Sequence, residues 1–137
     1  ETSSKEITLV SDNDKNKIDI QRSAEMIYGL RNFIGNAIKF SKRKVNIFLM
    51  SDEKEIKIVV NDDGPGFPKD IIDKLGEPYI KSRSLELNPN SGLGLGTFLG
   101  KTLLERQNAK LLFKDDKNLG GASVVISWSP KNILLNV

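Results

Sequence analysis

The chain has 137 residues, a length suited to one domain with a single hydrophobic core. Its 21 basic and 18 acidic residues give a net charge of +3, and the lysines are scattered instead of forming a tract, so nucleic acid is not indicated as a partner. The chain lacks histidine, which excludes a histidine base, a histidine metal ligand and a phosphohistidine within it, and it lacks cysteine, which excludes disulfides and favours an intracellular origin.

The first predicted elements are two short apolar segments, residues 7–10 and 18–20, which flank a polar run. We predict two short strands joined by a turn. From Ser23, apolar residues recur at three- and four-residue steps, which predicts an amphipathic helix that ends near Ser41. The apolar face of this helix is formed by Ile27, Leu30, Ile34, Ala37 and Ile38.

Two segments of alternating pattern follow the helix, at residues 45–50 and 56–61, with a charged turn between them. We predict an antiparallel pair of strands. The two-residue period places Asp62 on the same side of its strand as Val60, so its carboxylate should lie at the inner end of the strand and face the covering helices. A buried carboxylate in that position needs a partner.

The second half of the chain opens with a short predicted helix at residues 68–75 and a long loop at residues 76–91, and loops of this length are usually functional or mobile. A second amphipathic helix follows and ends before Asn108. Its apolar side carries Leu95, Phe98, Leu99, Thr102 and Leu103.

A hairpin of residues 110–114 and 122–129 closes the chain. Because helices and antiparallel pairs are interspersed, we predict an α+β fold: a two-layer sandwich in which a mixed, mostly antiparallel sheet is covered on one face by about three helices. All 137 residues are expected to form this single domain. No apolar run approaches the ~20 residues of a membrane span, so we expect a soluble chain.

A polar stripe runs beside the apolar face of the first helix. Asn32, Asn36 and Lys39 advance by four and three residues, which keeps their side chains close together on a helix of 3.6 residues per turn. A side-chain amide oxygen is a hard ligand suited to Mg²⁺, and Lys39 could contact a phosphate. The alternative is an ordinary solvated helix face.

An acidic, glycine-containing turn, residues 62–66, ends the second strand of the predicted pair. In a binding site Asp62 would accept a hydrogen bond from an exocyclic amine, while Gly64 and Gly66 would let the backbone approach a flat base such as adenine. The alternative is a simple tight turn, because aspartate, glycine and proline are the usual turn residues.

A glycine run, residues 92–96, leads directly into the second predicted helix. Free backbone N–H groups at a helix start, next to glycines that allow close approach, form a seat for phosphate. A flexible hinge before a helix would have the same pattern. Residues 100–102 are similar to the end of a P-loop, but Leu95 stands where that motif needs glycine, so we reject that interpretation.

In this order the three motifs resemble the nucleotide-binding boxes of the catalytic domain of sensor histidine kinases, within the GHKL superfamily that includes gyrase B, Hsp90 and MutL ATPases. The resemblance covers roughly Met26 to Ser129. Residues 31–41 are similar to the asparagine box, 62–67 and 92–96 to the two glycine boxes, and 78–83 to the phenylalanine box, with Tyr79 in place of its aromatic residue. Residues 27–30 and 96–106 look most like the RegB/PrrB branch of redox-responsive kinases.

The resemblance implies a Bergerat ATP-binding fold with Mg²⁺ and ATP as its ligands. The nucleotide-binding residues that it implies are Asn32, Asn36, Lys39, Phe40, Asp62, Gly64, Gly66, Tyr79, Lys81, Arg83, Gly92, Leu93, Gly94, Leu95, Gly96 and Ser123. Among them Asn36 would coordinate Mg²⁺ with support from Asn32, Lys39 and Arg83 would contact phosphates, and Asp62 would bind the adenine amine.

Two further features follow from the resemblance. Residues 76–91 would form a lid that closes over the phosphates, although Asn90 stands where many relatives begin the second glycine box with glycine. The small residue that often supports adenine through a water molecule would be Ala122 or Ser123.

The family donates the γ-phosphoryl group of ATP to a histidine in two-component signal transduction. Hydrolytic members of the superfamily are expected to carry a glutamate one turn before the magnesium asparagine, but here Asn32 occupies that place, and its amide cannot accept a proton at neutral pH. Hydrolysis should therefore be slow, whereas phosphoryl transfer needs mainly orientation and charge neutralisation. The acceptor histidine must lie outside this chain, on a separate dimerisation domain.

The implied partners are that histidine-bearing domain, in a homodimeric parent protein, and a cognate response regulator, with no nucleic acid and no membrane contact by this domain. The implied location is cytoplasmic, in a parent that can be anchored in the inner membrane. The same pocket would also serve a non-enzymatic ATP-binding regulatory module, a serine kinase similar to anti-sigma factors, or an ATPase. Phosphate transfer to a supplied dimerisation domain, acid-stable labelling of a serine and phosphate release without an acceptor distinguish these functions.

Overall fold

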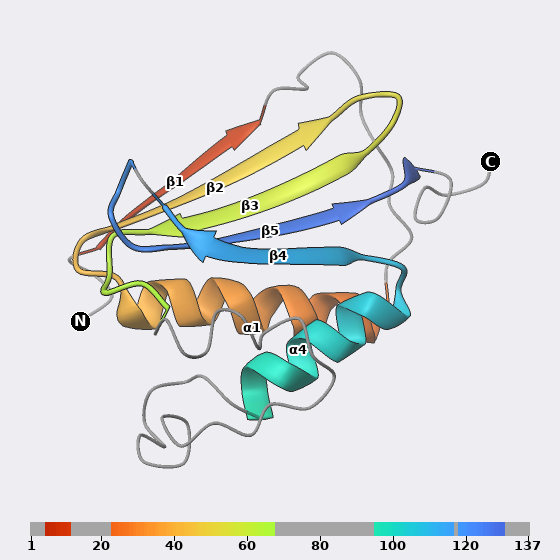
Figure 1. Cartoon of the computed structure of the whole chain (residues 1–137), viewed down its shortest axis with the longest axis horizontal. Coiled ribbons are helices and arrows are strands. Elements are labelled where there is room, and N and C mark those ends of the chain that lie inside the picture. Colours follow the sequence, from red (N-terminus) through yellow and green to blue (C-terminus); the bar gives the residue numbers. More distant parts are fainter. Residues whose placement is uncertain (1–4, 12–22, 68–94, 117, 131–137) are drawn as a thin grey trace.

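A computed structural model describes residues 5–11, 23–67, 95–116 and 118–130, and every structural statement below concerns these residues. Both helices lie on one face of a five-stranded sheet (Figure 1). The strands are β1 (Glu6–Ser11), β2 (Lys44–Ser51), β3 (Ile56–Asp62), β4 (Lys110–Asp115) and β5 (Ala122–Trp128), and the helices are α1 (Ala24–Phe40) and α4 (Leu95–Arg106). The predicted two-layer α+β class is confirmed, and the third predicted helix, residues 68–75, lies outside the described residues.

The sheet has the strand order β1-β2-β3-β5-β4 and is mixed. The predicted antiparallel pair of β2 and β3 is confirmed, as is the closing hairpin of β4 and β5. β1 contains the predicted strand at residues 7–10, but it pairs in parallel with β2. Its expected partner, residues 18–20, lies outside the described residues. Lys5 fastens the start of β1 to the end of α1, because its Nζ donates a 2.6 Å hydrogen bond to the carbonyl of Ile38.

α1 matches the predicted helix at both ends. Ser23 caps its start, where the Ser23 Oγ accepts a 3.1 Å hydrogen bond from the N–H of Met26. At the other end, the N–H of Ser41 bonds to the carbonyl of Ala37. These caps satisfy backbone groups that a helix end leaves without partners.

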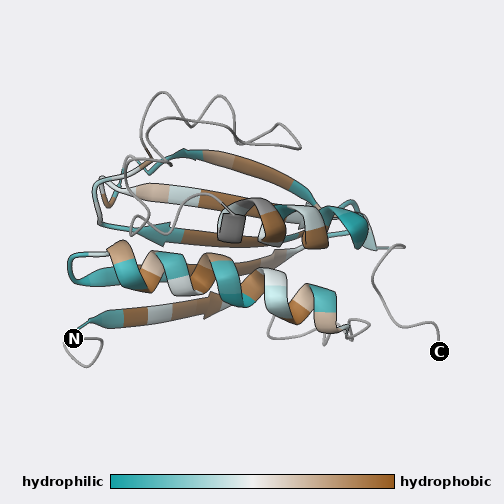
Figure 2. Ribbon diagram, turned by 90° about the horizontal axis from the view of Figure 1, so that it is seen from below, coloured by the Kyte–Doolittle hydropathy of each residue, from teal (hydrophilic) through white to brown (hydrophobic). Residues whose placement is uncertain are grey.

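The buried face of α1 is centred differently from the predicted apolar stripe. Its buried residues are Met26, Gly29, Phe33 and Ala37. The predicted residues Leu30, Ile34 and Ile38 are partly buried and pack against the core from the side. The shift arises because α1 contacts the sheet on one side and α4 on another (Figure 2).

α4 ends before Asn108, as predicted. The N–H of Asn108 bonds to the carbonyl of Glu105 and the N–H of Ala109 to that of Leu104, at 2.9 and 3.0 Å. Asn108 has φ 69°, so this is a Schellman cap with asparagine in the left-handed position. No helix in the described ranges is long and apolar enough to cross a membrane.

The predicted apolar side of α4 is wrong at Leu99, which is 42% exposed. The buried face consists of Thr97, Gly100, Lys101 and Leu104. Glycines stand where α1 and α4 approach most closely: a Cβ added at Gly29 would lie 2.5 Å from the Leu104 Cγ and 3.2 Å from the carbonyl oxygen of Gly100.

The core between the layers has two parts. The larger packs α1 and α4 on β4 and β5 and includes Phe33 and Val124. The smaller packs the second half of α1 on β2 and β3 and includes Ala37 and Val60. All four of these residues line one cavity, so the cavity opens where the two parts meet.

Candidate functional site

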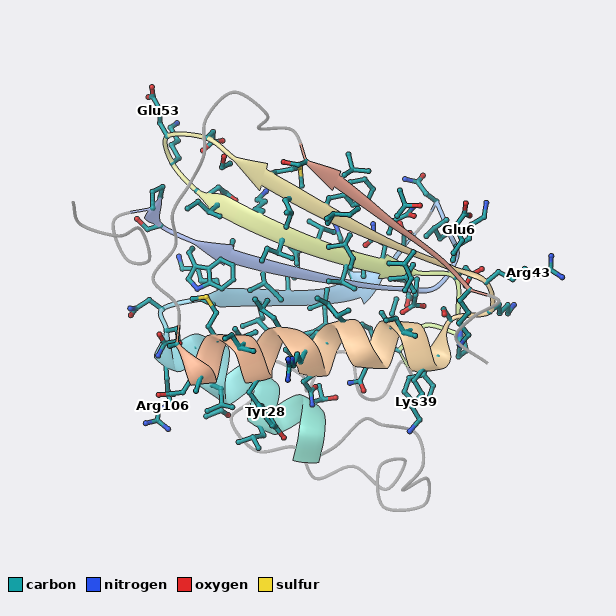
Figure 3. All side chains as sticks on the ribbon, turned by 180° about the vertical axis from the view of Figure 1, so that it is seen from behind. Glu6, Tyr28, Lys39, Arg43, Glu53 and Arg106 are labelled. Atoms are coloured by element: carbon teal, nitrogen blue, oxygen red, sulfur yellow. The ribbon has the colours of Figure 1, made fainter. Side chains whose placement is uncertain are left out.

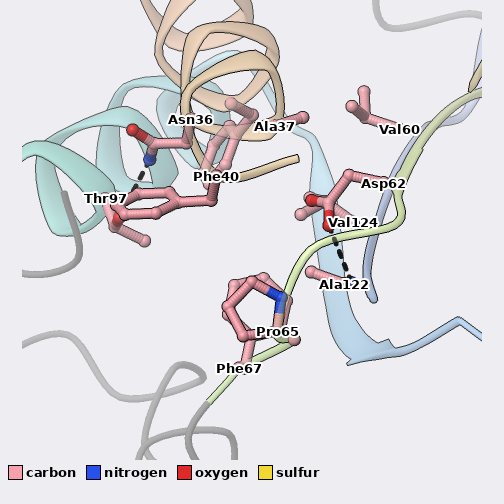
Figure 4. A pocket seen from close by; sticks show the side chains of 12 residues that line it. Asn36, Ala37, Phe40, Val60, Asp62, Pro65, Phe67, Thr97, Ala122 and Val124 are labelled. Carbon is pink, nitrogen blue, oxygen red and sulfur yellow. Dashed lines mark hydrogen bonds between the residues drawn. The ribbon is translucent and has the colours of Figure 1, made fainter. Parts of the chain in front are cut away.

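The cavity has a volume of about 270 Å³ and lies between α1, the end of β3, the turn after β3, the start of β5 and the start of α4 (Figure 4). Its walls are mostly apolar, and its polar side chains are Asn36, Asp62 and Thr97. A mostly apolar cavity with a few fixed polar groups is the usual form of a small-molecule site. The volume is slightly below the usual range of about 300–1,000 Å³, which suits a single flat ring system more than a large ligand.

One wall of the cavity is aromatic. Phe33 and Phe67 line it, and each packs against Phe113 of β4 with 5.7 Å between ring centroids. Phe113 is buried and so supports both rings from within the core. An aromatic ligand in the cavity could pack against these supported rings.

Asp62 lies at the inner end of β3, as the two-residue period predicted, and is 5% exposed. Its Oδ1 accepts hydrogen bonds from the N–H of Gly64 at 2.8 Å and of Ala122 at 3.2 Å. Neither bond uses Oδ2, which leaves that oxygen as an acceptor for a ligand. Burial raises the pKa of Asp62 above its ordinary value of 3.8, and it outweighs the two backbone hydrogen bonds, which lower it.

The next residue, Asp63, has a structural role. Its Oδ1 accepts hydrogen bonds from the N–H groups of Lys42 at 2.7 Å and Arg43 at 3.1 Å. Asp63 therefore ties the connection between α1 and β2 to the end of β3, and it fixes the end of α1 beside Asp62.

Two glycines allow the backbone to close around Asp62. A Cβ added at Gly64 would overlap the carbonyl oxygen of Phe40, and one added at Gly121 would lie 2.5 Å from the Asp62 Oδ1. Gly66, which lines the cavity, has φ +80°, a conformation that side-chain-bearing residues rarely adopt. The acid-glycine turn is thus built from residues without side chains where the chain passes closest to the carboxylate.

The predicted asparagine stripe forms a hydrogen-bonded group. The Nδ2 of Asn36 donates to the Oδ1 of Asn32 and to the Oγ1 of Thr97, both at 3.4 Å, with the amide orientation assigned from these bonds. Neither bond uses the Oδ1 of Asn36, which remains an oxygen that could coordinate a cation. Asn36 lines the cavity, whereas Asn32 packs against Gly100 between the two helices.

Lys39 and Phe40 lie at the end of α1 beside the cavity. Phe40 lines it, and the Nζ of Lys39 lies 5.3 Å from the Phe40 ring centroid. Lys39 is exposed, and its side chain points away from the sheet (Figure 3). Its ammonium is therefore near the rim of the cavity and not within its walls.

The structure decides between the two small residues at the start of β5. Ala122 lines the cavity, and its N–H binds Asp62. Since side chains alternate along a strand and both Ala122 and Val124 face the cavity, Ser123 points to the opposite face of the sheet. The predicted cavity position thus falls on Ala122, one residue before Ser123.

Of the predicted site residues, Asn36, Phe40, Asp62 and Gly66 line one cavity although they come from two separate segments of the sequence. Leu95 and Gly96 form the first turn of α4. The predicted lid, residues 76–91, and the residues Tyr79, Lys81, Arg83, Gly92, Leu93 and Gly94 lie outside the described residues.

Sequence reasoning missed Phe33, Phe67, Thr97 and Gly121 as parts of the site. Phe33 stands three residues before Asn36 on the same helix, so helical spacing could have identified it. Phe67 directly follows the acid-glycine turn, and Thr97 directly follows the glycine run. Gly121 carries no signal of its own, because its role depends on its contact with Asp62 from another strand.

The arrangement can bind a flat heteroaromatic ring that donates a hydrogen bond. Such a ring would pack on the aromatic wall and present an N–H donor to the buried Asp62. No group of three or more carboxylate, histidine or cysteine side chains that could hold a metal ion occurs in the described part of the chain. A metal at Asn36 would therefore need oxygen ligands from a bound molecule as well.

Comparison with known proteins agrees with this chemistry. Residues 21–132 match the family described as histidine kinase-, DNA gyrase B- and HSP90-like ATPase. The chain is 40% identical over 105 residues to the sensor histidine kinase RegB of Cereibacter sphaeroides, covering 73% of this chain and 23% of RegB. It is 30% identical over 101 residues to the sensor histidine kinase CpxA of Escherichia coli, covering 74% of this chain and 22% of CpxA. The chain thus spans about a quarter of the length of these relatives.

Solved structures share the fold. The catalytic domain of histidine kinase ThkA superposes with a TM-score of 0.71 at 18% identity, over 93% of this chain and 80% of that one. The ATP-binding domain of PrrB from Mycobacterium tuberculosis superposes with a TM-score of 0.65 at 19% identity, over 92% of this chain and 80% of that one.

Proposed function

This chain belongs to the family of histidine kinase-, DNA gyrase B- and HSP90-like ATPases, and from its site we propose that it binds Mg²⁺-ATP and donates the γ-phosphoryl group to a histidine on a separate dimerisation domain. The observation that carries the proposal is the buried Asp62 in the wall of a mostly apolar cavity. One of its carboxylate oxygens is held by backbone N–H groups, and the other is available to a ligand. This proposal includes a role in two-component signal transduction, with a cognate response regulator downstream.

Adenine fits the cavity by its chemistry. Its flat ring would pack against Phe33 and Phe67, and its exocyclic amine would donate to the Oδ2 of Asp62. Gly64 and Gly66 would let the turn backbone approach the ring, and Ala122 leaves room for it. The cavity volume of about 270 Å³ accommodates the base, so the phosphates would extend beyond it.

The phosphates would lie toward the ends of the two helices. Lys39 at the rim and the backbone N–H groups at the start of α4 would contact them, together with Lys81, Arg83 and the glycine run at residues 92–96. Residues 76–91, with Tyr79, would form the lid. Each of these roles is part of the proposal.

Mg²⁺ fits the donor set around Asn36. A side-chain amide oxygen is a hard ligand, and magnesium usually combines one or two protein ligands with phosphate oxygens and waters. The Nδ2 of Asn36 is already engaged by Asn32 and Thr97, which orients the amide. Asn36 would therefore be the ligand, and Asn32 would support it. The bound metal would supply charge neutralisation on the phosphates.

The residues of the site favour transfer over hydrolysis. An ATPase needs a group that activates water, and the position one turn before Asn36 holds Asn32, whose amide oxygen accepts a hydrogen bond from Asn36 and whose amide cannot take a proton at neutral pH. We therefore expect slow hydrolysis and transfer that requires the histidine-bearing domain. The parent would be a homodimer whose kinase region is cytoplasmic, with this domain itself making no membrane contact.

Calorimetric titration of ATP with and without Mg²⁺ tests the proposal. We expect Mg²⁺ to tighten ATP binding about tenfold in the natural chain, equal to ~1.4 kcal/mol, and we expect Asn36→Ala to remove this gain. Asn46→Ala, a half-buried asparagine on the opposite face of the sheet, is the matched control and should keep the gain. Absence of ATP binding, or an unchanged magnesium effect in Asn36→Ala, would contradict the assigned site.

A further inference from the structure

The sheet has a second face that no described helix covers. α1 and α4 both lie on the face that carries the core and the cavity (Figures 1 and 2). The opposite face is called the outer face here. When one face of an antiparallel sheet is open to water, its residues are usually polar.

The outer face instead carries one apolar side chain from each of the five strands, in register. Val10 pairs with Phe48, Phe48 with Val59, Val59 with Val125, and Val125 with Leu112. These five residues, called the outer row, alternate with inward neighbours such as Val60 and Val124, so they point away from the cavity. Side chains directly opposite one another in a ladder touch, so the row is continuous.

The outer row is accessible. Val10 is 44% exposed and Leu112 is 55% exposed, and the three central residues are partly buried. Four strand spacings of ~4.8 Å make the row ~19 Å long. It is also narrow, because one flanking row is polar, with Thr8, Asn46, Asn61, Ser123 and Lys114 in register.

Charges on the outer face are mainly positive. The alternation places Lys44, Lys57, Lys110, Lys114 and Glu6 on this face. Lys57 and Lys110 are on one side of the outer row and Lys114 is on the other. Lys57 forms an ion pair of 3.1 Å with Glu55, and both of these side chains remain about 40% exposed.

We propose that the outer row is a docking surface for an acidic amphipathic protein segment, in which apolar side chains are flanked by carboxylates. Apolar side chains would cover the row, and carboxylates would meet the lysines on both sides. A second copy of this chain would bring like charges together, which opposes self-association. A membrane surface would need apolar side chains that reach into the headgroup region, whereas the three central residues of the row are partly buried.

This inference does not depend on nucleotide binding, because the outer row and the cavity lie on opposite faces of β3 and β5.

Two synthetic peptides test the inference. One carries leucines at helical i, i+3, i+4 and i+7 spacing flanked by glutamates, and the other carries lysines in place of the glutamates. Backbone amide NMR spectra of the ¹⁵N-labelled chain are recorded during titration with each. We expect the acidic peptide to bind, with shifts centred on Phe48, Val59 and Val125, and the basic peptide to bind at least tenfold more weakly.

Variants assign the binding to the outer row. The double variant Val10→Ser with Leu112→Ser should weaken the acidic peptide about tenfold, and Lys110→Glu with Lys114→Glu should reverse the preference between the peptides. Leu99→Ser removes an exposed leucine on α4 and should leave peptide affinity unchanged. ATP affinity should stay constant in all three, which also shows that they fold.

Three results would overturn the inference: no binding of the acidic peptide, equal binding of both peptides, or shifts centred on α1 and α4. Binding to vesicles of phosphatidylglycerol is measured as a separate test for a membrane partner. If the chain binds these vesicles through Leu112 and does not bind the acidic peptide, the surface serves a membrane and the proposed protein partner is wrong.

Discussion

The carboxyl group of Asp62 combines two properties that seldom occur together: it is 5% exposed, and one of its oxygens remains unused by the protein. The backbone N–H groups of Gly64 and Ala122 both bind Oδ1, so the protein itself determines which oxygen a ligand meets. Gly121 makes this geometry possible, because any side chain there would push the carboxylate aside. A single buried acceptor in a fixed orientation is well suited to select among bases by their donors.

Asp62→Asn should weaken the preference of the site for ATP over GTP. The two N–H groups that hold Oδ1 would hold the amide oxygen in the variant, so the NH₂ group would take the place of Oδ2 and face the adenine amine as a second donor. We expect ATP affinity to fall about 10- to 100-fold, equal to ~1.4–2.8 kcal/mol, while GTP, which presents a carbonyl, loses less. Competition titrations with both nucleotides measure this, and an unchanged preference for ATP would contradict the assignment of Asp62.

The raised pKa of Asp62 also predicts how stability depends on pH. Between 3.8 and the raised value, the folded chain binds more protons than the unfolded chain. The contribution of Asp62 to stability is therefore fully present below pH 3.8 and is lost as the pH rises through the folded pKa. Relative to Asp62→Asn, the natural chain should lose stability as the pH rises from 3.8 through the raised pKa of Asp62. Urea unfolding of both proteins across this range tests it, and a constant difference would exclude the effect.

At the scale of elements, α1 makes two different contacts with two sides of its surface. One side, with Phe33 and Ala37, packs on the sheet and lines the cavity. The other contacts α4, where Gly29 meets Leu104 and Asn32 meets Gly100. The close approach of the two helices is what brings Thr97 within hydrogen-bond distance of Asn36.

Two glycines of α1 should respond oppositely to the same substitution. Gly29→Ala would place a Cβ 2.5 Å from the Cγ of the fully buried Leu104, so we expect it to destabilise the fold by ~1–3 kcal/mol. Gly35 is exposed with no atom within 4 Å of an added Cβ, so Gly35→Ala should stabilise the chain by ~0.5–1 kcal/mol. Denaturant unfolding of the two variants measures both values. Equal effects would mean that α1 and α4 do not pack as closely as described.

At the scale of the whole molecule, one sheet separates two kinds of surface. The covered face gathers Asn36, Phe40, Asp62 and Ala122 around the cavity, while the outer face carries the apolar outer row. The chain contains no histidine, so the proposed phosphoryl acceptor must be supplied in trans or from elsewhere in the parent.

This requirement gives a prediction for activity. With γ-labelled ATP, the chain alone should acquire no acid-labile phosphate, and addition of the histidine-bearing dimerisation domain of the parent should produce acid-labile label on that domain. Acid-stable label on serine would indicate a serine kinase, and rapid phosphate release without an acceptor would indicate an ATPase. Tight ATP binding without any transfer would indicate a regulatory module. Asp62→Asn serves as the control, because it should reduce transfer from ATP.

The sequence by itself determined the local elements and their polarity. The three- and four-residue spacing from Ser23 to Ser41 identified α1, and the alternation before Asp62 identified both β3 and the inward direction of the carboxylate. These features are readable because they depend on the period of a helix or strand, which is fixed by backbone geometry. For the same reason Asn32 and Asn36 of the asparagine stripe were predicted correctly as neighbouring side chains.

The tertiary structure alone decided which of these faces meet. In α4, Thr97 and Leu104 are buried while Leu99 is exposed. β1 pairs in parallel with β2, and the N–H of Ala122 binds the carboxylate of Asp62. Each outcome depends on contacts between segments far apart in the chain, above all the close packing of two helices at glycines. A periodic pattern records which side of an element is apolar, but the neighbour that covers that side is chosen by the free energy of packing the whole molecule.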